Sequence, residues 1–128
     1  MPITRVGRVR QSGDIAAGMV IDKPWGCEIV LRLTDDQCVK MLRIKKGCRL
    51  SLQYHRVKSE KMKLDGGNAF LEIHRDGIIY EHSLEEPVEI LPGTIHRVVA
   101  VEESIVLEIS TPELDDVVRV ADDYGRRA

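Results

Sequence analysis

The sequence predicts an all-β domain, built as a sandwich or as a closed antiparallel barrel. Short segments in which apolar and polar residues alternate recur from residue 27 to 110, and Gly, Pro, Asp and Asn separate them. Apolar residues make up 43% of the chain, yet only one Trp, three Tyr and one Phe are aromatic. Val, Ile and Leu must therefore supply most of the core.

The length of 128 residues indicates one domain covering the whole chain. Nineteen Lys and Arg against 21 Asp and Glu leave no broad cationic face, which disfavours a nucleic-acid partner. No apolar run approaches the roughly 20 residues of a membrane helix, and no signal peptide is evident. Three cysteines without a CxxC pair argue against a disulfide framework. We expect a cytoplasmic protein that has no membrane partner.

Residues 1–21 are expected to form an N-terminal arm. Within it, Ile3–Val9 alternates well enough to add a strand to the sheet of a second copy. A homodimer is therefore predicted.

Cys38–Ile44 has the period-2 pattern of a strand, and Lys46-Gly47 follows it as a break. Arg49–His55 is expected as the next strand, with Gln53 and His55 projecting from the same side. Two polar side chains that can bind a ligand are thus placed together.

Asp65-Gly66-Gly67 is a strong turn signal and predicts a hairpin between Glu60–Leu64 and Asn68–His74. The other expected strands are Ile78–Glu81, Pro87–Leu91, His96–Val101 and Ser104–Ser110. The total of roughly eight suits a two-sheet antiparallel barrel. From Thr111 on, we expect a turn or a short 3₁₀ segment, because Val117, Val118 and Val120 are poor helix formers.

Four side chains form a candidate metal site: Gln53, His55, Glu60 and His96. Their oxygen and imidazole nitrogen atoms suit one divalent transition metal, such as Zn, Mn, Fe, Co or Ni. Four protein ligands would leave room for water or a substrate oxygen. The alternative is a polar strand face held by hydrogen bonds.

Several stretches together resemble the cupin family, in order and in spacing, from about residue 22 to 126: Lys23-Pro24-Trp25-Gly26, Ser51–His55, Ser59-Glu60, His96-Arg97, Asp115–Arg119 and Asp122–Arg126. They are most similar to the type II phosphomannose isomerase module. That module forms the C-terminal part of bifunctional phosphomannose isomerase/GDP-mannose pyrophosphorylase enzymes and also occurs alone. The resemblance implies a double-stranded β-helix, or jelly-roll, barrel with a metal site, in which Gln53 replaces the first His of the commoner motif.

The chain departs from the family pattern just after the first ligand histidine. Lys58, Lys61 and Met62 stand where the family has Arg, His and Trp. Because Arg binds an oxyanion bidentately and Lys acts as a point charge, the change at residue 58 bears directly on substrate binding.

Further candidates lie on the expected strands and turns. Lys40 and Glu108 could face the interior, and either could then act as a general acid or base. Lys58 is a candidate for catalysis and for binding phosphate. The alternative is that it is a solvated lysine on a strand edge. Arg97 is a candidate phosphate contact, although alternation turns it away from His96 and a salt bridge or subunit contact is as plausible. Trp25 either closes a barrel end or stacks on a sugar.

The leading hypothesis is a metal-dependent sugar-phosphate isomerase, similar to mannose-6-phosphate isomerase, with a sugar phosphate or nucleotide sugar as its partner. The alternative is a cupin module that binds such a sugar without turning it over, which the lost Arg, His and Trp would allow. A third reading is an Fe(II) cupin dioxygenase, because similar ligand sets serve such enzymes.

Overall fold

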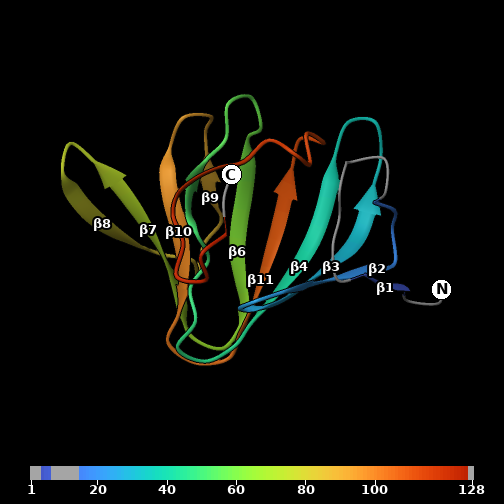
Figure 1. The fold of residues 1–128 in the computed structure, drawn as a ribbon, viewed down its shortest axis with the longest axis horizontal. Coiled ribbons are helices and arrows are strands. Elements are labelled where there is room, and N and C mark those ends of the chain that lie inside the picture. Colours follow the sequence, from blue (N-terminus) through green and yellow to red (C-terminus); the bar gives the residue numbers. More distant parts are fainter. Residues whose placement is uncertain (1–3, 7–14, 127–128) are drawn as a thin grey trace.

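The computed structural model describes residues 4–6 and 15–126, which form two packed β-sheets (Figure 1). The first sheet has seven strands in the order β1-β2-β3-β4-β11-β6-β9, and the second has five in the order β12-β5-β10-β7-β8. The bounds are β1 Thr4–Val6, β2 Met19–Lys23, β3 Gly26–Leu33, β4 Cys38–Ile44, β5 Leu52–Tyr54, β6 Glu60–Gly66, β7 Ala69–Arg75, β8 Ile78–Ser83, β9 Val88–Ile90, β10 Ile95–Ala100, β11 Ser104–Ser110 and β12 Val118–Ala121. The all-β prediction is confirmed, with twelve described strands in place of roughly eight.

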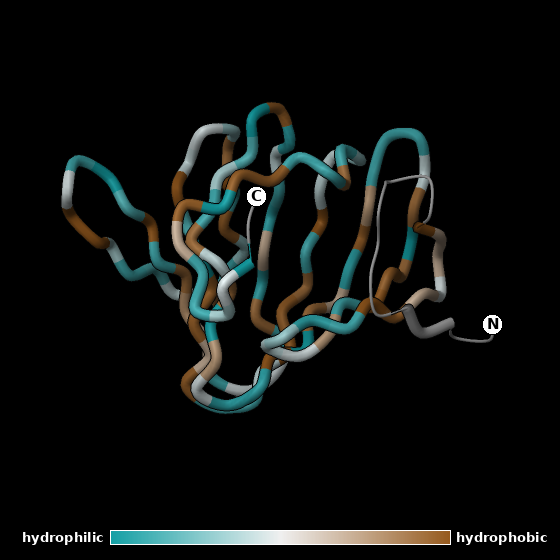
Figure 2. Tube along the Cα trace, viewed as in Figure 1, coloured by the Kyte–Doolittle hydropathy of each residue, from teal (hydrophilic) through white to brown (hydrophobic). Residues whose placement is uncertain are grey.

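The core lies between the sheets, and apolar side chains from both contribute to it. Leu42 and Val106 of the first sheet and Leu71 and Val98 of the second are fully buried. Hydrophobic and hydrophilic segments alternate along the strands in Figure 2. The same alternation on β4 that buries Leu42 also turns Lys40 inward. Among the described residues there is no helix long and apolar enough to cross a membrane.

The predicted hairpin at Asp65-Gly66-Gly67 is wrong. Strand β6 pairs with β11 and β9 in the first sheet, whereas β7 pairs with β10 and β8 in the second. The turn therefore carries the chain from one sheet to the other. A turn signal fixes a change of direction, but partners distant in the sequence decide which sheet each strand joins.

The end of the chain also differs from the expectation. Thr111–Val117 lacks regular structure, as expected, but Val118–Ala121 forms β12 beside β5. Valine is a poor helix former and a good strand former, so an available edge of the second sheet takes up this segment.

The expected N-terminal arm is only partly described. Its last residues belong to β2, and Thr4–Val6 pairs in parallel with β2 of the same chain. The rest of Ile3–Val9 lies outside the described residues.

The turn between β2 and β3 depends on Gly26, whose φ is +151°. A Cβ atom there would lie 1.8 Å from the backbone oxygen of Arg43 on the neighbouring strand. We expect Gly26→Ala to lower the free energy of unfolding by about 2–4 kcal/mol, because backbone strain and overpacking add.

Gly77→Ala in the β7–β8 turn is the matched control. Gly77 also has a positive φ, +74°, but its added Cβ would meet no atom within 4 Å. Gly77→Ala should lower the free energy of unfolding by about 1 kcal/mol. If denaturant-induced unfolding gives equal losses of stability for the two variants, the contact with Arg43 does not constrain the turn between β2 and β3.

Candidate metal centre

His55, Glu60 and His96 meet in the gap between the two sheets. Glu60 begins β6 in the first sheet, His96 lies on β10 in the second, and His55 directly follows β5. The Glu60 Oε1 atom is 3.1 Å from His55 Nε2 and 3.0 Å from His96 Nε2. All three side chains are buried, and one ligand atom from each lies within 4.8 Å of the other two.

Backbone carbonyls fix the orientation of both imidazoles. His55 Nδ1 donates to the backbone oxygen of Asp116 at 2.5 Å, and His96 Nδ1 donates to that of Thr94 at 2.8 Å. A neutral imidazole with its proton on Nδ1 has a lone pair on Nε2. Both Nε2 atoms face the Glu60 carboxylate: a protonated imidazole donates to it there, and a neutral one offers its lone pair to a cation held between them.

The spacing of these donors also fits a transition metal. Bonds of about 2.0–2.2 Å put neighbouring ligand atoms about 3 Å apart around an octahedral ion and about 3.4 Å apart around a tetrahedral one. The two Glu60–imidazole distances of 3.1 and 3.0 Å lie near these values. Imidazole nitrogen with carboxylate oxygen suits Zn, Mn, Fe, Co or Ni. The residues present therefore fit a divalent ion.

Gln53 lies beside this group. The antiparallel register of β5 and β10 places Gln53 directly opposite His96, so both side chains project from the same face of the sheet. Gln53 also lines the same cavity as His55 and Glu60. The structure thus brings together all four residues of the predicted set.

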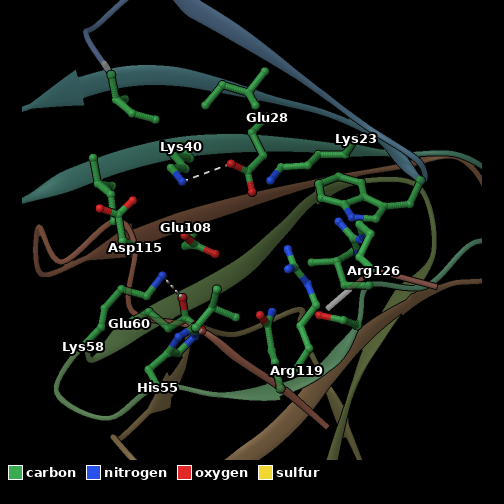
Figure 3. A pocket seen from close by; sticks show the side chains of 18 residues that line it. Lys23, Glu28, Lys40, His55, Lys58, Glu60, Glu108, Asp115, Arg119 and Arg126 are labelled. Atoms are coloured by element: carbon green, nitrogen blue, oxygen red, sulfur yellow. Dashed lines mark hydrogen bonds and ion pairs between the residues drawn. The ribbon is translucent and has the colours of Figure 1, made fainter. Parts of the chain in front are cut away.

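A cavity of about 410 Å³ opens next to the metal group (Figure 3). Of the other predicted site residues, Lys58, Lys40, Glu108 and Trp25 line it, and Arg97 does not. The Trp25 side chain is only 2% exposed and packs with the core, so it borders the cavity as part of a buried wall.

Arg97 points away from the cavity, on the opposite face of β10 from His96. It is 4% exposed, with its guanidinium 3.9 Å from Glu72 and 3.8 Å from Asp123. The expected phosphate contact is not available to it there, and ion pairs occupy it instead.

Lys58 is buried, with its Nζ 3.6 Å from Glu60 Oε2. Asp116 holds the loop that carries it, since its carboxylate accepts the backbone N–H groups of Arg56, Val57 and Lys58 at 2.9, 2.7 and 2.8 Å. Desolvation opposes ionisation of Asp116, but these three hydrogen bonds lower its pKa to about 2. Asp116 is a positioning residue that the sequence did not single out.

Three charged side chains cross the inner face of the first sheet. Lys40 Nζ donates to Glu28 Oε1 at 3.0 Å, and Lys40 lies opposite Glu108 in the register of β4 and β11. Burial, and then the negative charge of Glu60, raises the pKa of the Glu108 carboxyl to about 7. Burial lowers the pKa of Lys40, but Glu28 and Glu108 outweigh it and raise the pKa above its usual value. Glu28 was missed; its inward place on β3 was the available signal.

Four more residues line the cavity to which the sequence assigned no role: Lys23, Asp115, Arg119 and Arg126. Arg119 lies on β12, the strand that sequence reasoning did not expect. Without that strand, its register against Gln53 could not be seen.

The model of the family described as mannose-6-phosphate isomerase C-terminal matches residues 11–122. The chain belongs to this family. Among curated proteins, none matches the sequence closely enough to indicate a relative.

Solved structures similar to this member of the mannose-6-phosphate isomerase C-terminal family include KdgF from Halomonas sp., with 19% identity, 75% of this chain and 87% of that chain covered, and a TM-score of 0.62. An RmlC-like cupin from Shewanella frigidimarina has 18% identity, coverages of 75% and 85%, and a TM-score of 0.63. The capsular polysaccharide assembling protein CapF from Staphylococcus aureus has 19% identity, coverages of 84% and 30%, and a TM-score of 0.56. These likenesses confirm the predicted cupin fold.

We expect His55→Ala and His96→Ala each to remove most of the metal bound by the wild type, because each deletes one of few ligands in a buried site. His82→Ala is the control, since His82 is exposed on β8. Elemental analysis after dialysis against Mn²⁺, Co²⁺ or Zn²⁺ measures the metal content. Unchanged content in both site variants would place the ion elsewhere.

Asp116→Ala should lower the free energy of unfolding by about 1 kcal/mol, as for the loss of a side-chain cap on backbone N–H groups. Metal affinity should fall about tenfold, because the loop beside His55 loosens. Since the folded pKa of Asp116 is depressed, its stabilisation is present above about pH 4 and is lost as pH falls toward 2.

Glu113→Ala, which removes an exposed carboxylate from the same segment, is the control for Asp116→Ala. Denaturant unfolding and metal titration of both variants test whether the Asp116 carboxylate holds the loop beside His55. A difference between wild type and Asp116→Ala that persists undiminished at pH 2 would rule out the carboxylate as its source.

Proposed function

We propose that the protein is a metal-dependent sugar-phosphate isomerase that interconverts the aldose and ketose forms of a phosphorylated hexose. Its family makes mannose 6-phosphate the first substrate to test. The observation that carries the proposal is that one cavity joins the His55–Glu60–His96 group to the buried side chains of Glu108 and Lys58. Aldose–ketose exchange needs both carbonyl polarisation and a proton shuttle.

A divalent ion held by Gln53, His55, Glu60 and His96 would supply a Lewis acid for the carbonyl and its neighbouring hydroxyl. Glu108 is the best placed base, because it is buried in the cavity wall and its pKa of about 7 lets it accept and release a proton near neutral pH.

Glu108 takes the proton from C2 of the aldose and returns it to C1, while the hydroxyl proton passes from O2 to O1. The product thus contains the same atoms as the substrate. Lys58 balances the negative charge that develops on the oxygens. Lys40 is a poor base, because its ammonium donates to Glu28 and its pKa is raised. Its charge instead helps to hold the nearby carboxylates.

A second candidate function is a module that binds a sugar nucleotide without turnover. The observation that favours it is that the two residues after Glu60 bring no polar group to the cavity: Lys61 is exposed, and Met62 is buried in the core. Neither lines the cavity. CapF, which shares the fold, is described as a capsular polysaccharide assembling protein, which also fits a ligand of this class.

Lys58→Ala should lower kcat/KM about ten- to hundredfold at unchanged metal content, because a hydrogen bond to a charged group is worth about 1.5–3 kcal/mol. Lys58→Arg should retain much of the activity, since it keeps the positive charge beside Glu60. Lys61 on β6 is exposed and provides the control, so Lys61→Ala should leave activity unchanged. NMR of metal-loaded protein with mannose, glucose and fructose 6-phosphates measures the conversion.

No conversion of any of these sugars by wild type or Lys58→Arg, with equal binding of a sugar nucleotide by all variants, would favour the binding module. Oxygen uptake by the Fe(II)-loaded protein would instead support the dioxygenase reading.

A further inference from the structure

The cavity has a basic end, formed by Lys23, Arg119 and Arg126, that the metal group does not use. Lys23 ends β2, Arg119 lies on β12, and Arg126 follows β12 in the chain. In Figure 3, Lys23 and Arg126 lie on one side of the cavity, and Lys58, Glu60 and His55 on the other.

Neighbouring side chains hold Arg126 in place. The Asp122 carboxylate accepts from Arg126 Nε at 3.0 Å and from Nη2 at 2.9 Å, and the guanidinium lies 5.5 Å from the centre of the Tyr124 ring. A guanidinium has five N–H donors, so three remain after these two bonds. A side chain already held in this way loses little entropy on binding an anion.

Lys23, Arg119 and Arg126 bring three basic groups to one end of the cavity. Burial lowers the pKa of Lys23, Glu28 opposes this shift, and the smaller effects of Lys40, Arg126 and Arg119 lower the pKa further. Burial and the nearby Arg126 likewise lower the pKa of Arg119. The Glu28 carboxylate, which opposes the shift in Lys23, already accepts a hydrogen bond from Lys40. An anion bound among these three groups would stabilise their charged forms.

The register of the second sheet sets the distance from the basic end to the metal group. Arg119 lies opposite Gln53, and Gln53 lies opposite His96, so the three form one row across neighbouring strands. At about 4.8 Å between strands, the row spans about 10 Å. The six bonds from C2 to the phosphorus of a hexose 6-phosphate extend about 7 Å, judged from the reach of an extended chain. One such ligand, with side chains reaching toward it, can contact both ends.

We infer that the basic end binds the phosphate of the substrate while the sugar carbonyl faces the His55–Glu60–His96 group. The identity of the ligand as a sugar phosphate rests on the proposed function, but the anion site itself does not. Lys58, which is 3.6 Å from Glu60, then serves the reacting oxygens and does not hold the phosphate.

Calorimetric titration of the full chain with inorganic phosphate, mannose 6-phosphate and mannose tests the inference. Arg119→Gln and Lys23→Gln should each weaken binding of phosphate and of mannose 6-phosphate at least tenfold, with mannose binding and metal content unchanged. Arg119→Lys should retain part of the affinity, because it keeps the charge. Arg32→Gln removes an exposed arginine from β3 and should change nothing.

Where the protein is active, the basic-end variants should raise KM far more than they lower kcat, because the phosphate is remote from the reacting carbons. Wild-type affinity for phosphate in Arg119→Gln and Lys23→Gln, or no phosphate binding by the wild type, would overturn the inference whatever the activity. Loss of phosphate binding in these variants without any isomerase activity in the wild type would uphold the anion site and reject the isomerase. Circular dichroism of each variant verifies its fold, and the two substitutions lie on separate strands.

Discussion

The position of Glu60 between two imidazoles is the interaction on which the rest of the site depends. Its carboxylate is almost fully buried, which is unfavourable for a charge unless partners compensate. Desolvation raises its pKa, but His55, His96 and Lys58 outweigh this and keep the pKa well below the usual value. Because Glu60 belongs to one sheet and His96 to the other, the charge can be compensated only when both sheets and the His55 loop are in place. Asp116 matters here, since its carboxylate holds that loop and its carbonyl orients His55.

The two sheets contribute different chemistry to one cavity. The first provides carboxylates and an ammonium group, from Glu28, Lys40 and Glu108 on neighbouring strands. The second provides the amide and guanidinium of Gln53 and Arg119, with His96 in the same row. In an antiparallel register, residues that lie opposite each other on one face are about 5 Å apart. Each sheet therefore brings its polar groups close to one another. In the proposed isomerase, the base Glu108 would thus come from the first sheet, while Arg119 and His96 of the second would face the ligand.

The sequence was informative wherever a local period decided the outcome. Alternation placed Lys40 inside and turned Arg97 away from His96, and the spacing of Gln53, His55 and Glu60 located three members of the site. It failed where partners distant in the chain decide. The Asp65-Gly66-Gly67 turn reads the same whether it closes a hairpin or crosses between sheets, and β12 forms only because β5 offers an edge. The basic end was missed for this reason, since Arg119 has no visible neighbour until β12 is paired.

The lysine at residue 58 is easier to understand once the phosphate is assigned to the basic end. A guanidinium fork is valuable where it grips a phosphate, because two parallel hydrogen bonds fix the anion. Two of the three basic residues at that end, Arg119 and Arg126, are arginines. Lys58 lies instead beside Glu60, where the need is for a positive charge near a carboxylate and near developing negative charge on oxygen. A point charge on a flexible stem meets that need, so the departure from the family pattern at residue 58 is compatible with an intact substrate grip.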